Sequence, residues 1–265
     1  MSLFYFNNKQ ESNTFWEHLE ELRWLILRML VVLGLLFSVV FSFRDFIFNK
    51  IIFPPLSSNF VVYRSLCKLA DWLHNPDFCP GDFRINLINL ELTGQFMAHI
   101  STAATIAAVI AVPYLLYELW RFVAPALYPH ERKNVGWVFV TSSFLFYLGA
   151  VVSYYLIFPL TIRFLGTYQV SGLVPNQISL DSYLSTLFIL VFAMGLMFEM
   201  PVLAYFLSRL GILNARMLKS VRSYALIILL ILSAIITPTT DPFTMLAVAL
   251  PLYLLYELSI VVCKK

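Results

Sequence analysis

Long apolar runs constrain this chain more than any other feature. Hydrophobic residues make up 60% of its 265 residues and charged residues only 12%, whereas soluble domains average about 25% charged residues. A transmembrane helix needs about 20 consecutive apolar residues. Six such runs occur, at about residues 24–43, 95–118, 135–158, 184–208, 222–237 and 243–262. We therefore predict an all-α integral membrane protein, a concave bundle of six transmembrane helices in one domain, 1–265.

The two ends of the chain differ in what their apolar runs predict. The first run is too long for the apolar part of a secretory signal and is interpreted as a retained span. The fifth run is short, and Thr237-Pro-Thr-Thr-Asp-Pro242 follows it. Pro and Asp are typical of turns, so the fifth and sixth runs are predicted to form a shallow hairpin whose turn Asp241 organises.

Positive charge predicts the orientation in the membrane, because cytoplasmic loops are enriched in Lys and Arg. With the N-terminus inside, eleven Lys and Arg residues lie near the inner ends of the runs and six near the outer ends, which leaves Arg28 within the first run. Five of the six outer ones belong to one long loop, 44–93, where charge counts for less. Both termini are therefore predicted to be cytoplasmic.

That outer loop contains two cysteines, Cys67 and Cys79. An oxidising outer compartment favours a disulfide between them, and two free thiols are the equally weighted alternative. Leu66, Leu69 and Ala70 recur at helical spacing, which predicts a short surface helix.

Two charged stretches interrupt the apolar chain. In the first, residues 15–23, Glu17 and Glu20 are interpreted as favourable charges in the first turns of a helix, whereas Glu21 lies one turn deeper and its role stays open. The second, residues 121–133, is aromatic and rich in proline; alone it reads as an interfacial belt with a solvated end. Together, Glu21 and Glu131 offer two carboxylates on one face, which suits a ligand with guanidinium groups.

Glu199 lies deep in the fourth run, about ten residues or roughly 15 Å before Arg209. A carboxyl group at that depth is costly and indicates function by default. Pro201 removes a helix hydrogen bond beside it, which predicts a bend and a polar notch for docking a partner. The alternative is a protonated Glu199 bonded to a neighbouring helix. Glu257, near the inner end of the last run, can reach the interface and is grouped with Glu199 and Pro201 as a candidate intramembrane docking residue.

Several classes of function are disfavoured. Sequence patterns of metalloproteases, serine hydrolases, dinucleotide-binding folds and phosphate loops are absent, so no enzyme, catalytic residue or cofactor is predicted. The four histidines are dispersed, which argues against a metal site, and no basic run indicates nucleic acid. A proton-coupled small-molecule secondary transporter using Glu199 is the main alternative, although such proteins often show repeats and paired helix breaks, and this chain has one break.

Ordered motifs resemble those of the TatC family, the receptor subunit of the twin-arginine protein translocase. Glu17-His-Leu-Glu-Glu-Leu-Arg23 is similar to its amino-terminal signature, and the segment Trp120 to Arg132 to its first cytoplasmic loop. Phe198-Glu-Met-Pro201 and Thr237-Pro-x-x-Asp241 match later motifs in order.

This resemblance implies a function that composition does not supply. Family members bind the twin-arginine signal peptides of folded precursor proteins at the cytoplasmic face of the bacterial inner membrane. They form oligomeric complexes with the single-span proteins TatA and TatB within the lipid, and the protonmotive force drives export. By resemblance, the recognition acids are Glu21 and Glu131, and the intramembrane acid is Glu199. The residues that match the surrounding patterns are Arg23, Phe122, Pro125, His130, Asp241 and Glu257.

Overall fold

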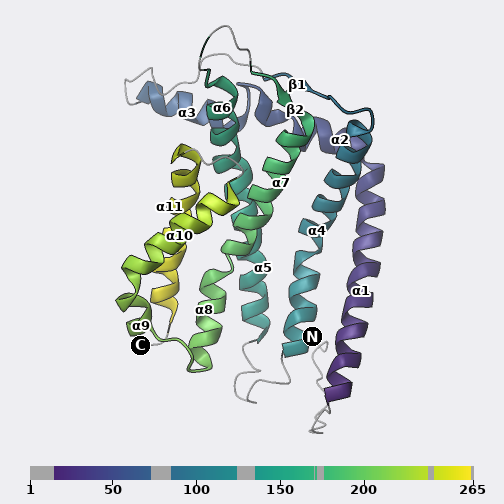
Figure 1. The fold of residues 1–265 in the computed structure, drawn as a ribbon. Coiled ribbons are helices and arrows are strands. Elements are labelled where there is room, and N and C mark those ends of the chain that lie inside the picture. Colours follow the sequence, from purple (N-terminus) through teal and green to yellow (C-terminus); the bar gives the residue numbers. More distant parts are fainter. Residues whose placement is uncertain are drawn as a thin grey trace.

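The computed structural model describes residues 15–72, 85–123, 135–169, 171, 176–237 and 242–263. Long helices stand side by side across the molecule, and shorter elements cover their upper end (Figure 1). The helical elements are α1 (Phe15–Ser42), α2 (Arg44–Ile47), η1 (Phe48–Ile52), η2 (Pro54–Leu56), α3 (Val61–Trp72), α4 (Gly94–Val123), α5 (Val135–Val152), η6 (Ser153–Ile157), α6 (Phe158–Thr167), α7 (Leu180–Met197), α8 (Met200–Arg209), α9 (Ala215–Ser220), α10 (Arg222–Ile236) and α11 (Pro242–Val262). Two strands, β1 (Leu87–Ile88) and β2 (Ile178–Ser179), complete the described elements.

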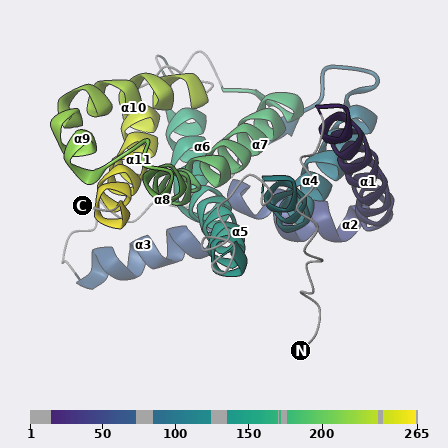
Figure 2. The ribbon, with the colours of Figure 1, turned by 90° about the horizontal axis from the view of Figure 1, so that it is seen from below.

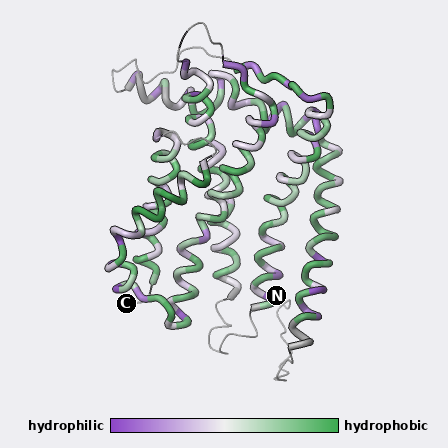
Figure 3. The backbone as a smooth tube through the Cα atoms, viewed as in Figure 1, coloured by the Kyte–Doolittle hydropathy of each residue, from purple (hydrophilic) through white to green (hydrophobic). Residues whose placement is uncertain are grey.

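Five segments among the described residues are long and apolar enough to cross a membrane. They are Leu19–Ser42, Gly94–Phe122, Val138–Thr167, Leu180–Arg209 and Thr244–Val262. The predicted fifth span corresponds to α10, which is apolar but has only 15 residues. Hydrophobic residues dominate the middle of the helices, and hydrophilic ones gather toward the two ends (Figure 3). The fold is therefore that of a mostly helical membrane protein, and the fifth of the six predicted spans stays a prediction.

Some helices extend beyond the apolar runs that predict them. Helix α1 begins at Phe15 rather than near residue 24, so the first charged stretch continues the first span as one helix. Helix α5 continues through the π-helical turn η6 into α6, which ends at Thr167. Hydropathy marks the lipid-facing part of a helix, whereas the helix itself persists wherever neighbouring elements support it.

Close helix contacts hold the centre of the bundle together. Helix α5 packs on α7 through two glycines, where an added Cβ would lie 2.6 Å from the carbonyl oxygen of Met194 at Gly149 and 2.6 Å from the Phe146 ring at Gly195. Helix α4 packs on α1, and its His99 ring stacks on Phe41 at 3.9 Å between ring centroids. Small residues at such positions let membrane helices approach closely.

A cap of short elements covers the outer end. It is tied to the long helices by buried tyrosines: the Tyr63 hydroxyl donates to the carbonyl oxygen of Pro159 at 2.7 Å, and the Tyr183 hydroxyl to that of Ile52 at 2.5 Å. Burial raises the pKa of the Tyr63 phenol. Helix α3 covers the segment whose spacing predicts a helix. The structure also contains the parallel pair of β1 and β2, which the all-α prediction did not include.

The start of α1 and the end of α11 lie at the same end of the bundle, opposite the end that holds α3 (Figure 1). With the predicted orientation, a thiol reagent that does not cross membranes should label Asp71→Cys in α3 only from outside. It should label Met217→Cys in α9 only after the cytoplasmic side is opened. Both side chains are exposed. Labelling on the reverse sides would invert the topology.

Candidate functional site

The candidate site begins on α1, at the lower end of the bundle in Figure 1. Glu21 and Arg23 lie in the second and third turns of this helix, and both side chains are exposed. The candidate span on α1 begins at Leu19, so both residues lie within its first two turns. Helix α1 thus presents the predicted recognition acid on a regular helix and not on a loop.

An ion pair that sequence reasoning missed joins α1 to α4 just above this position. Arg28 Nη2 donates to Glu118 Oε2 at 2.9 Å, and the Tyr114 hydroxyl donates to Glu118 Oε1 at 2.9 Å. Glu118 is 3% exposed. Two opposite charges within separate apolar runs are the signal that could have predicted this contact, because charges in membrane spans usually pair.

Helix α4 leads directly toward the second charged stretch. It ends at Val123, and Phe122 in its last turn is partly buried. Trp120 contacts Phe206 of α8 edge-on, with ring centroids 5.2 Å apart. Four predicted site residues, Pro125, His130, Glu131 and Asp241, lie outside the described residues. The structure thus places α1 beside the helix that precedes Glu131.

Glu199 lies where the fourth span is interrupted. The α-helix breaks between Met197 and Met200, and Pro201 follows in the first turn of α8. Glu199 is 8% exposed and accepts a hydrogen bond from the Ser142 hydroxyl of α5. Its second oxygen, Oε1, is buried and has no hydrogen-bond partner among the described residues. The carboxyl group is therefore held by one donor and keeps one unused acceptor.

A groove of about 430 Å³ adjoins this break. It lies between α5, α8 and α11, and its lining includes Thr141, Pro201, Tyr205 and Leu258. Glu199 is not among the lining residues. The carboxyl group sits beside the groove and faces Ser142, so the predicted notch and its docking role remain predictions.

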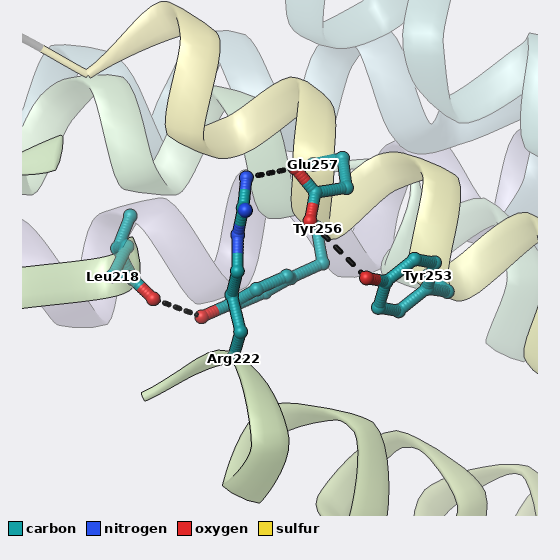
Figure 4. Close-up of polar contacts among 5 residues, drawn as sticks. All are labelled: Leu218, Arg222, Tyr253, Tyr256 and Glu257. Atoms are coloured by element: carbon teal, nitrogen blue, oxygen red, sulfur yellow. Dashed lines mark hydrogen bonds and ion pairs between the residues drawn. The ribbon is translucent and has the colours of Figure 1, made fainter. Parts of the chain in front are cut away.

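Glu257 joins the last two apolar helices. Arg222 Nη2 of α10 donates to Glu257 Oε2 of α11 at 2.7 Å, and the Tyr253 hydroxyl donates to Glu257 Oε1 at 3.2 Å (Figure 4). Tyr256 points away from Glu257 and donates to the carbonyl oxygen of Leu218 at 2.7 Å. These contacts tie the lower ends of α9, α10 and α11 together, and the predicted docking role of Glu257 stays a prediction.

The remaining candidates concern cysteine and metal. Cys67 in α3 is disulfide-bonded, and Cys263 is free and buried. Cys79 lies outside the described residues, so its pairing with Cys67 stays a prediction. Within the described part of the chain, no group of His, Cys, Asp and Glu side chains is arranged to hold a metal ion.

Comparison with known proteins identifies the family. Residues 17–251 match the family described as Sec-independent protein translocase protein (TatC). The chain belongs to the TatC family. It is 32% identical to the TatC of Blattabacterium sp. subsp. Periplaneta americana over 255 residues, 96% of each chain. It is 33% identical to the TatC of Aquifex aeolicus over 245 residues, 92% of each chain.

Two solved TatC structures share the fold. One, described as the twin arginine translocase receptor TatC, superposes with a TM-score of 0.69 at 31% identity and covers 93% of this chain and 97% of that chain. The other, TatC in the detergent DDM, gives a TM-score of 0.74 at 32% identity, with 94% and 100% covered. This TatC-family chain is thus a membrane protein and a component of a Sec-independent protein translocase, with a role in protein transport rather than catalysis.

Proposed function

We propose that this chain binds twin-arginine signal peptides at the cytoplasmic face of the bacterial inner membrane. Glu21 and Glu131 bind the two guanidinium groups, and Arg23, Phe122, Pro125 and His130 shape the surroundings. The observation that supports this most directly is the position of Glu21. It is exposed on α1, and α1 packs along α4, the helix that leads into the segment containing Glu131.

Carboxylates suit this ligand for a chemical reason. The planar guanidinium of arginine forms two parallel hydrogen bonds to one carboxylate, which the compact ammonium of lysine does not reproduce. A site with two separate carboxylates therefore discriminates two adjacent arginines from two lysines. A solved relative carries the description twin arginine translocase receptor, which agrees with this assignment.

Binding of the signal peptide would nucleate a larger complex. By family membership, the partners are single-span TatA- and TatB-type proteins and further copies of this chain, and the protonmotive force drives export. Glu199, with its unused buried oxygen beside the broken helix, is the polar group proposed to meet a partner or a signal segment inside the membrane. A small-molecule transporter is less well supported, because the family match extends over residues 17–251.

Site-specific photocrosslinking tests the proposed site. A photoreactive amino acid at position 21 or 131 of the full chain in membranes should crosslink to a twin-arginine signal peptide. The matched control is position 20, since Glu20 is also exposed on α1 but lies about 100° around the helix. Equal crosslinking at all three positions would indicate contact without a specific site, and no crosslinking at 21 and 131 would contradict the proposal.

A further inference from the structure

In the ion pair between α1 and α4, the carboxylate is hydrogen-bonded through both oxygens, whereas the guanidinium keeps one nitrogen without a partner among the described residues. Both carboxylate oxygens of Glu118 accept hydrogen bonds, one from Arg28 and one from Tyr114. Arg28 donates through Nη2, whereas its Nε is buried and has no partner among the described residues. The Arg28 side chain is 40% exposed, against 3% for Glu118. Arg28 therefore binds Glu118 through one nitrogen, and the pair is not bidentate.

Such geometry is a poor source of stability. A buried ion pair offsets the cost of desolvating its charges only when the geometry is excellent and the remaining donors are satisfied. The unused Nε of Arg28 does not meet that condition. The best-attested use of an imperfect buried polar contact is to fix register between helices, because a shift along the helix would leave both charges unpaired.

The register in question is the position of α1 along α4, the two helices that carry Glu21 and Phe122. Glu21 and Arg28 are seven residues apart on α1, so they lie on nearly the same face, about two turns or roughly 10 Å apart. On α4, Glu118 and Phe122 are one turn apart on one face. Helices α1 and α4 run side by side in both views (Figures 1 and 2). A shift at the ion pair would therefore move Glu21 relative to Phe122.

Building on the function proposed above, we propose that Arg28, Glu118 and Tyr114 are positioning residues for signal-peptide recognition. The cluster, defined by these three side chains, sets the height of α1 against α4. It thereby sets the height of Glu21 on α1 relative to Phe122 on α4. The cluster itself does not contact the peptide.

The first measurement is the affinity of the full chain in lipid nanodiscs for a fluorescent twin-arginine signal peptide. The decisive variant replaces both charges, Arg28→Leu with Glu118→Leu, because it leaves no unpaired buried charge and is expected to fold. It should bind about tenfold more weakly, a coupling of typical size for contacting residues. The exchange of charges, Arg28→Glu with Glu118→Arg, should recover most of that loss. Arg44→Gln, an exposed position at the outer end, should bind as the parent does.

The second measurement separates positioning from a general structural role. Spin labels at positions 20 and 121, both exposed, in a Cys263→Ala background, report the separation between α1 and α4 at the site by double electron–electron resonance. The leucine pair should broaden the distance distribution, and the charge exchange should narrow it again. A leucine pair with parental affinity and an unchanged distribution would overturn the proposal. So would a charge-exchanged variant with a restored distribution but still weak binding, because Glu118 would then contact the peptide directly.

The peptide affinity of Glu21→Gln distinguishes a failure of the proposed recognition site from a failure of the positioning role. If Glu21→Gln binds the peptide as tightly as the parent, the proposed recognition site fails. If Glu21→Gln weakens binding while the leucine pair does not, only the positioning role fails. Thermal unfolding of each variant in the same nanodiscs checks that the compared proteins are folded.

Discussion

Replacing Glu131 by Gln should weaken binding of a twin-arginine signal peptide about tenfold to a hundredfold. A charge-assisted pair of this kind, partly shielded from water, contributes roughly 1.5–3 kcal/mol, and each 1.4 kcal/mol is a factor of ten in affinity. Glu21→Gln should cause a loss of the same order, since each carboxylate is proposed to bind one guanidinium. The measurement is the Kd of the full chain in nanodiscs for a labelled peptide.

Two controls make this result specific. A twin-lysine peptide, which binds weakly from the start, should be almost unaffected by Glu131→Gln. Glu20→Gln removes an exposed carboxylate next to Glu21 on the same helix and should leave the affinity within about twofold, because exposed charges contribute little. Equal losses for both peptides would point to general destabilisation of the site, and an unchanged Kd would refute the assignment.

Replacing Glu199 by Ala should reduce transport about tenfold or more while leaving peptide affinity nearly unchanged. The substitution removes the buried acceptor beside the helix break, and losing a buried hydrogen-bonding group costs about 1–3 kcal/mol. That cost is expected to fall on the step in which a partner or signal segment enters the membrane, since the break between α7 and α8 lies well above the lower end of α1 in Figure 1. The assay is export of a folded reporter from cells, with signal affinity measured in parallel.

Matched variants separate the carboxyl group from its surroundings. Glu199→Gln keeps an acceptor for the Ser142 hydroxyl and should retain more transport than Glu199→Ala. Ser142→Ala removes only the donor and should have the smallest effect, because the hydroxyl is a single neutral partner. Parental transport by Glu199→Ala would remove any role for this acid, and a parallel fall in signal affinity would place its effect at the cytoplasmic site instead.

Hydropathy predicted the five long apolar helices, because lipid imposes a length and an apolar surface on each crossing helix. It does not mark the start of α1 at Phe15, because residues 15–23 include several charged residues and are not an apolar run. Nor could it predict the two-residue ladder of β1 and β2, which depends on where α6 and the outer cap bring those segments.

The site was predictable only in part. Glu199 stands out in the sequence because one acid in a long apolar run is rare. Its bond to Ser142 depends on the rotation of α5 against the broken fourth span, which no local pattern records. The Arg28–Glu118 pair spans 90 residues of sequence, and its register follows from how α1 packs along α4. Pairing across helices is a property of the assembled bundle.

The unequal lengths of the helices have a consequence for the surrounding lipid. Helix α10 has 15 residues, a rise of about 22 Å, whereas the third span extends over 30 residues, about 45 Å. A hydrocarbon layer of about 30 Å is too thick for the first and too thin for the second. The apolar surface that α10 offers to lipid is therefore short, and that of the third span is long. Should α10 cross the membrane as predicted, the bilayer would have to become thinner toward it, at a cost of a fraction of a kcal/mol per Å of mismatch.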